Sequence, residues 1–152
     1  MNINKPNNKL IMEDSPTLLT LDLTIATKTR EICQQGYQLF DSGDLKAALR
    51  QFYSAWTLLP KPQTQWEEAG WILTALGDAY FTKGDFESGR EALNSALHCP
   101  KAPGNPFIHL RLGQCLFELG ELNDARTHFQ TVKESGGAEL FVAEPRKYQN
   151  LC

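Results

Sequence analysis

The stretch LGDAYFTKGDF (residues 76–86) decides the fold. Its two glycines stand seven residues apart, and this interval occurs three times, in Gly36…Gly43, Gly77…Gly84 and Gly113…Gly120. Each second glycine is followed by an acid and an apolar residue, as in Gly84-Asp85-Phe86. Glycine commonly ends a helix, and an acid just after it can cap the free N–H groups of the next helix. The chain is therefore predicted to contain three helix-turn-helix units.

Small and bulky residues recur at fixed offsets after each turn glycine. They stand five, nine and twelve positions later: Ala48, Gly89 and Ala125; Phe52, Leu93 and Phe129; Ala55, Ala96 and Val132. These offsets trace one face of a helix. The first glycine of each unit lies within a helix, where it costs about 1 kcal/mol relative to alanine. We expect it to permit a close approach of the second helix of the unit.

The pattern Leu76-Gly77-x-x-Tyr80, the Gly-Asp turn and the closing Pro60 or Pro100 resemble the tetratricopeptide repeat (TPR) motif. The resemblance covers about residues 29 to 139 and implies an all-α fold, a short α-solenoid of three TPR units. The turn glycines are separated by 41 and then 36 residues, against a family period of about 34. We expect units at about 29–62, 64–103 and 105–139, with residues 61–66 mostly lengthening the first helix of the second unit.

Both ends of the chain are predicted to differ from the repeats. Apolar and polar residues alternate from Leu19 to Ile25, which is the period of a strand. We therefore predict that residues 1–28 form an N-terminal arm, extended or partly disordered. Residues 140–152 are predicted to form a C-terminal cap of one or two short helices, interrupted near Pro145, because a terminal repeat needs a cover.

Composition and charge argue against several classes of protein. A hydrophobic content of 41% and a net charge of −3 are ordinary for a globular domain and give no basic face for nucleic acid. We find neither a run of about 18 apolar residues nor a leader-like start, and so expect a cytoplasmic protein without a membrane partner. The four cysteines (Cys33, Cys99, Cys115, Cys152) lack the spacing of metal ligands, and no metal or cofactor is expected.

Catalytic interpretations have little support. His98 beside Cys99 suggests a thiol with its base, but neighbours at a helix end point in different directions. His109 falls on a core-facing position. Gly136-Gly137 is a turn signal that lacks the Gly-Lys-Ser/Thr context of a phosphate loop. We expect no enzyme activity.

The TPR resemblance places ligand-binding residues on the concave face, which the first helix of each unit lines. The candidate groove residues are Arg30, Tyr37, Phe40, Asp41, Trp71, Asp78, Phe81, Phe107, Arg111, Gln114, Phe117 and Glu118. Six of them are aromatic, which predicts an aromatic groove for a polypeptide. In the alternative, some of the rings fill gaps between adjacent units. The TPR class that grips a C-terminal carboxylate through Lys and Asn is a poor match, because only Arg111 occupies a suitable place.

Four stretches carry a narrower resemblance: residues 71–81, 96–100, 104–115 and 144–148. They look like a group of small stand-alone bacterial TPR proteins often found beside polymorphic toxins, which implies an immunity protein that binds and neutralises a cognate toxin. The alternative is a secretion chaperone or a general TPR adaptor. Type III translocator chaperones are three-repeat proteins of about this size, and the stretch from Leu19 to Ile25 would then occupy the groove. The oligomeric state is left open.

Overall fold

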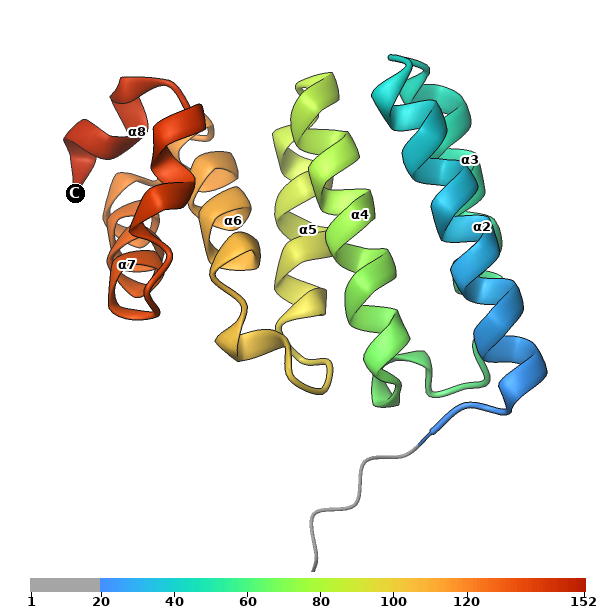
Figure 1. Cartoon of the computed structure of the whole chain (residues 1–152). Coiled ribbons are helices and arrows are strands. Elements are labelled where there is room, and N and C mark those ends of the chain that lie inside the picture. The colour runs from blue at the N-terminus through green and yellow to red at the C-terminus, as the bar shows by residue number, and fades with distance from the viewer. Residues whose placement is uncertain (1–19) are drawn as a thin grey trace, which may run out of the picture.

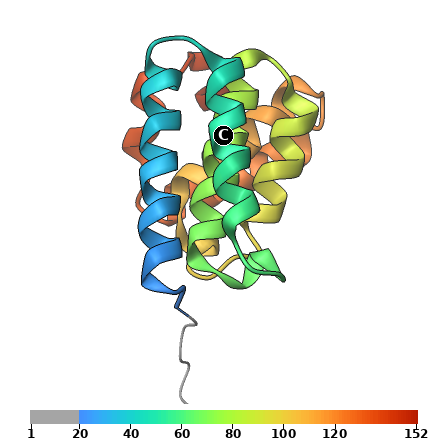
Figure 2. The same ribbon diagram turned by 90° about the vertical axis from the view of Figure 1, so that its right-hand side faces the viewer.

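The computed structural model describes residues 20–152, and the described chain is a curved stack of helices (Figure 1). The helices are α2 (Leu23–Asp41), α3 (Leu45–Leu58), α4 (Glu67–Lys83), α5 (Phe86–Ala96), α6 (Pro106–Glu118), α7 (Leu122–Glu134) and α8 (Arg146–Leu151). Three 3₁₀ turns accompany them: η1 (Gln63–Gln65), η2 (Ala102–Gly104) and η3 (Ala138–Ala143). Helices α2/α3, α4/α5 and α6/α7 pair as hairpins, and Figure 2 shows the first pair side by side. The predicted solenoid of three helix-turn-helix units is confirmed.

Each hairpin turns at a glycine in the left-handed region. The φ angles of Gly43, Gly84 and Gly120 are 90°, 89° and 84°, a conformation that glycine adopts without steric cost. Asp44 and Asp85 then cap the following helices, each accepting a backbone N–H bond at 3.1 Å. Glu121 is instead paired with Arg90 on α5 at 2.6 Å. The predicted acidic cap thus holds for the first two turns.

The mid-helix glycines bring the two helices of each unit into contact. A Cβ atom added to each glycine would lie within 2.6 Å of a side chain on the second helix: 2.5 Å for Gly36 with Phe52, 2.4 Å for Gly77 with Leu93, and 2.6 Å for Gly113 with Phe129. The three facing side chains are fully buried. The predicted close approach is confirmed, and its direct partner is the bulky residue nine positions after each turn.

Replacing Gly36 by alanine should lower the free energy of unfolding by about 1–2 kcal/mol. An added Cβ would lie 2.5 Å from the Phe52 ring, so the cost falls in the upper part of the usual range for overpacking, about 2–3 kcal/mol. The better helix propensity of alanine returns about 1 kcal/mol. Urea unfolding measures the change. The matched control is Gly104→Ala, since a Cβ there would contact nothing within 4 Å. Equal stability of Gly36→Ala and the unchanged protein would show that the ring of Phe52 can move aside freely.

Residues 23–28 are helical, so the prediction of an extended arm is wrong for them. The side chain of Asp22 caps α2 by accepting a bond from Thr24 N at 2.9 Å. Leu23 is 80% exposed, so the alternating pattern does not mark a buried strand face. The inward side has helical spacing and consists of Ile25, Thr29, Ile32 and Gly36. The remainder of the predicted arm, residues 1–19, lies outside the described residues.

The insertion at residues 61–66 forms a connection and not part of α4. It contains η1, and α4 begins only at Glu67. Gln63 Nε2 donates to the carbonyl of Trp56 at 2.9 Å, and Trp66 Nε1 donates to the carbonyl of Pro60 at 2.7 Å. These bonds tie the segment back to the end of α3. The expectation that the insertion lengthens the helix is therefore wrong.

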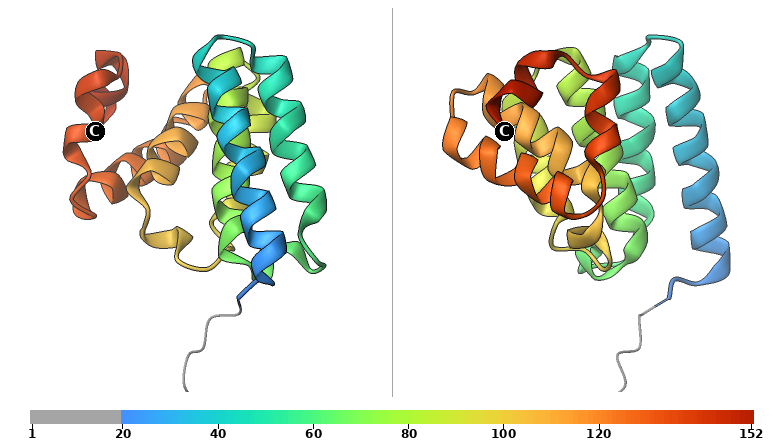
Figure 3. Two further views of the ribbon diagram at one scale, coloured as in Figure 1. Left: turned by 45° about the vertical axis from the view of Figure 1, so that its right-hand side comes forward. Right: turned by 60° about the vertical axis from the view of Figure 1, so that its left-hand side comes forward.

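The C-terminal segment folds back over the third unit (Figure 3). Its two helical pieces, η3 and α8, are separated at Glu144 and Pro145, where the sequence predicted an interruption. Phe141 and Tyr148 are buried, and their ring centroids lie 5.4 and 6.1 Å from that of Phe129. The segment thus shields the last hairpin from water.

Two histidines join α6 to α7. His109 is buried, as the sequence predicted, and its ring stacks on His128 with the Nδ1 atoms 3.0 Å apart. Nε2 of His109 donates to the carbonyl of Pro103 at 3.0 Å, so in the neutral ring Nδ1 accepts from His128. Burial, together with the neighbouring His109, lowers the pKa of His128 below its usual 6.5.

Lowering the pH from about 7.5 to about 5.5 should reduce the free energy of unfolding. Because the pKa of His128 is lower in the folded chain, the unfolded chain takes up the proton first. Stability present above pH 6.5 is therefore lost as the pH falls towards the folded pKa. Urea unfolding across this range measures the effect, and His128→Asn should flatten it. An equally steep dependence in the variant would assign the titration to another group.

Candidate functional site

The first helices of the three units line one face of the stack, with the second helices of the first two units behind them (Figure 1). All twelve candidate groove residues lie on these first helices: four on α2, three on α4 and five on α6. Residues at the same offset from the mid-helix glycine lie on the same side of each first helix, which explains why the candidates share these helices. The residues differ, however, in whether a partner can reach them.

The C-terminal segment covers the share of this face that α6 contributes. Glu144, between η3 and α8, accepts hydrogen bonds from Gln114 Nε2 at 2.5 Å and from Arg111 Nη1. Gln114 has no exposed surface, and neighbouring Leu110 is 2% exposed. The expectation that Gln114 faces an open groove is therefore wrong, because its amide already donates a hydrogen bond to the carboxylate of Glu144.

Arg111 is the centre of a charged cluster that holds the C-terminal segment. Its Nε donates to Asp78 on α4 at 2.7 Å, while Nη1 bonds Glu144. Its guanidinium lies 4.9 Å from the ring centroids of Phe81 and Phe107, an arrangement that favours a cation. Burial alone would lower the pKa of Arg111, but the two carboxylates outweigh it and raise the pKa above its usual value. Arg111 is thus committed to internal partners.

Glu118 and Phe117 also contact the C-terminal segment. Glu118 accepts a hydrogen bond from Tyr148 at 2.9 Å and pairs with Lys147. Although burial opposes it, these two donors lower the pKa of Glu118. The ring of Tyr148 lies 5.2 Å from Phe117 and 6.5 Å from Phe81. These two phenylalanines are half-buried and pack against the C-terminal segment, a contact that the repeat positions do not predict.

The share of the face contributed by α2 and the start of α4 is open. Tyr37 is 42% exposed and Trp71 is 48% exposed, while Arg30 is exposed near the middle of α2 and Asp41 at its C-terminal end. Phe40 is half-buried, with its ring 6.3 Å from Tyr37. Burial, assisted by nearby Asp78, raises the pKa of Tyr37 to about 12, so its hydroxyl stays protonated and able to donate. The accessible surface is thus smaller than the predicted groove.

Replacing Arg111 by methionine should lower the free energy of unfolding by about 2–4 kcal/mol. The change strands two largely buried carboxylates, those of Asp78 and Glu144, without their cation. Glu144→Gln keeps an acceptor for Gln114 and should cost about 1 kcal/mol. Lys147→Met, at a half-exposed pair, should cost at most about 1 kcal/mol. Urea unfolding of the three variants tests this order. An equal loss of stability in all three would contradict a central role of Arg111 in holding the C-terminal segment.

The His98–Cys99 pair is not assembled for catalysis. Cys99 is 3% exposed, and burial raises the pKa of its thiol to about 11, which disfavours the thiolate. Nδ1 of His98, just past the end of α5, lies 2.9 Å from the carbonyl of Asn94 in the last turn of that helix. The thiol and imidazole therefore serve local structure.

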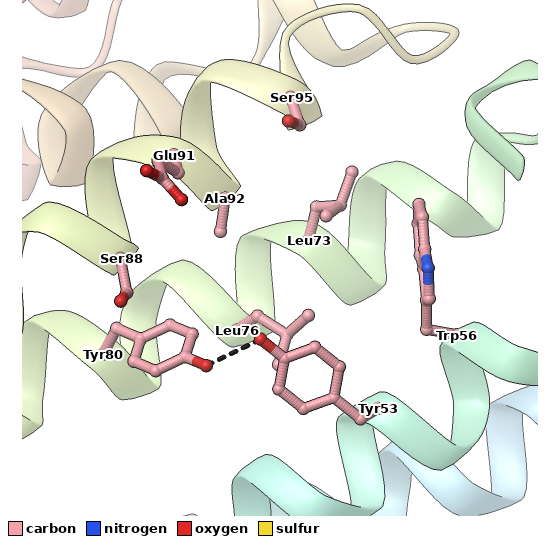
Figure 4. A pocket seen from close by; sticks show the side chains of 9 residues that line it. All are labelled: Tyr53, Trp56, Leu73, Leu76, Tyr80, Ser88, Glu91, Ala92 and Ser95. Atoms are coloured by element: carbon pink, nitrogen blue, oxygen red, sulfur yellow. Dashed lines mark hydrogen bonds between the residues drawn. The ribbon is translucent and has the colours of Figure 1, made fainter.

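A second concave feature lies between α3, α4 and α5, and sequence reasoning did not single it out (Figure 4). It is a cavity of about 260 Å³, lined by Tyr53, Trp56, Leu73, Leu76, Tyr80, Ser88, Glu91, Ala92 and Ser95. Its lining comes from three helices, so no motif within one repeat marks it.

Hairpins with a bulky residue packed on a mid-helix glycine, stacked around a common face, define a TPR solenoid. Among solved structures, the chain is similar to the NMR structure of the first TPR domain of the human RPAP3 protein. The TM-score is 0.66 at 18% sequence identity, over 81% of this chain and 91% of that domain. This likeness establishes the fold alone. No protein-family model and no curated protein sequence matches the chain.

Two further findings concern the described part of the chain. None of the helices within residues 20–152 has both the length and the apolar character needed to cross a lipid bilayer. Within the same residues, no group of three or more His, Cys, Asp or Glu side chains is placed to hold a metal ion.

Proposed function

We propose that this chain binds a polypeptide through the open part of its concave face, formed by α2 and α4. The observation that carries the proposal is the exposure of Tyr37 and Trp71 on two neighbouring first helices of a TPR solenoid. Large rings are costly to leave in water and supply much of the binding energy at protein interfaces. A fold that is typically a non-enzymatic scaffold for other proteins supports the same conclusion.

The spacing of the two rings indicates what kind of segment fits. Tyr37 follows its mid-helix glycine by one residue, whereas Trp71 precedes its own by six. Since equivalent positions in stacked units lie at about the same height, the rings are offset by about 10 Å along the helix axes. An extended peptide covers this offset in about three residues. Arg30 near the middle of α2 and Asp41 at its C-terminal end provide charges of both signs to orient it.

For the identity of the partner, we propose a toxin whose activity this chain blocks as an immunity protein. The support is the resemblance of residues 71–81, 96–100, 104–115 and 144–148 to small bacterial TPR proteins found beside polymorphic toxins. Tight binding over a shaped, partly aromatic surface is the physical property that such a role needs. The open surface is a feature of the structure, whereas the proposed identity of the partner rests on the resemblance.

The secretion-chaperone alternative loses the observation that favoured it. That alternative used an extended stretch from Leu19 to Ile25 to occupy the groove. Residues 23–25 instead belong to α2, and Leu21 is buried beside its start. A general adaptor role remains the alternative to the immunity role, and it uses the same open surface.

Co-expression with the product of the neighbouring reading frame tests the immunity role. The expected result is restored growth of the host and a stable complex that purifies intact. Trp71→Ala and Tyr37→Ala should each weaken the complex by about 2 kcal/mol or more, roughly thirtyfold. Isothermal titration calorimetry measures the dissociation constants.

Two controls separate binding from folding. Both variants should keep the helical circular dichroism of the unchanged protein, because the two rings are about half exposed. Phe117→Ala, which removes a ring beneath Tyr148, should instead lower stability. Absence of growth rescue and of any complex would rule out the immunity role. A complex that forms but is insensitive to Tyr37 and Trp71 would move the binding surface elsewhere.

A further inference from the structure

The cavity between α3, α4 and α5 is built mainly from aromatic and aliphatic side chains. Leu73 and Leu76 project from α4 to form its floor (Figure 4). Tyr53 and Trp56 form a wall on α3, and Ala92 lies opposite on α5. Tyr53 is 45% exposed, so the wall is open to solvent. The site lies between the second helices of units one and two and is separate from the concave face proposed above to bind a polypeptide.

The cavity differs in its lining from the hollow at the corresponding place between units two and three. That hollow, of about 320 Å³, is lined by Arg90, Glu121, Asp124 and His128 among others, and His128 stacks on His109. Their counterparts between units one and two are Leu73 and Ala92, at the same offsets from the glycines. Arg90 also bridges the second space by pairing with Glu121. The second hollow is thus lined largely by charged and polar side chains, whereas tyrosine and tryptophan side chains line the first.

One end of the cavity is polar and acidic. The hydroxyls of Tyr53 and Tyr80 lie 2.6 Å apart, and each retains lone pairs directed away from their mutual hydrogen bond. Burial and this bond raise the pKa of Tyr80, so its hydroxyl stays neutral. Glu91 lies at the rim, is exposed, and forms no ion pair within residues 20–152. Aromatic walls and an unpaired carboxylate together favour a cation.

We propose that this cavity binds an arginine side chain presented by a polypeptide partner. Its volume of about 260 Å³ is below the roughly 300–1,000 Å³ of pockets that bury drug-sized ligands, which favours a single long side chain. The methylene stem packs on Leu73, Leu76 and Ala92, and the planar guanidinium stacks against the aromatic wall. Glu91 and the tyrosine hydroxyls accept its N–H bonds.

The test is an NMR titration of the full chain with N-acetyl-arginine N-methylamide. The chain has three tryptophans, of which Trp56 reports on this cavity and Trp71 on the concave face. The indole N–H signal of Trp56, assigned with a Trp56→Phe variant, should shift saturably with a dissociation constant on the order of 1 mM. The neutral analogue N-acetyl-citrulline N-methylamide should shift it at least about fivefold more weakly.

Two variants and a control complete the experiment. Glu91→Gln preserves the shape and should weaken the arginine probe about three- to tenfold. Ala92→His places an imidazole in the cavity and should abolish the shift, with unchanged circular dichroism. Glu139→Gln, at an exposed position on η3, should leave binding unchanged. If Ala92→His fails to fold, Glu91→Gln still decides the matter.

The proposal is overturned if the Trp56 signal does not shift saturably, if citrulline binds as well as arginine, or if Glu91→Gln has no effect. These outcomes are independent of the concave face. Loss of partner binding in Trp71→Ala leaves the Trp56 response intact, so the two proposals fail separately.

Discussion

The contact between a mid-helix glycine and a bulky side chain of the following helix governs the whole stack. At Gly36, Gly77 and Gly113 the missing Cβ atom lets the second helix approach until its side chain touches the backbone of the first. This contact fixes how the two helices of a hairpin lie together, and the hairpins then stack through α3 with α4 and α5 with α6. The concave face and the spaces between second helices are both consequences of that spacing. Because protein interiors are closely packed, a change of one methyl group at this contact is felt throughout the unit.

The concave face has a covered part, held closed by a charged cluster in the third unit, and an open part in units one and two. Arg111 binds carboxylates from two directions, Asp78 on α4 and Glu144 on the C-terminal segment, and two rings cover its faces. The third unit thereby keeps its own chain in the position where a guest peptide would lie. Units one and two retain exposed rings. A groove that appears continuous from repeat positions alone is therefore open over only part of its length.

Local patterns predicted the hairpins, because a turn glycine, its capping acid and the bulky residue nine positions on lie close together in sequence. The same patterns placed all twelve groove candidates on the first helices. They did not reveal which candidates are covered, since Gln114 meets Glu144 across 30 residues and no offset within a repeat encodes that contact. The alternating stretch before residue 26 misled for a different reason: Ile25 and Thr29 face inward with helical spacing, while exposed Leu23 happens to fit a strand period. The cavity beside Ala92 is lined by side chains of three helices, and no offset within one repeat encodes that arrangement.

The different linings of the two spaces between second helices bear on how such a chain can change over time. A histidine pair and an ion pair border one space, whereas two tyrosine hydroxyls and Trp56 border the other. If a copy of the second unit were inserted after the third, a unit with the small Ala92 would pack against a unit with the larger His128 at the same position. The three units thus share a helix-turn-helix form but differ in the residues that contact the neighbouring unit. The fold therefore depends on the order of the units along the chain.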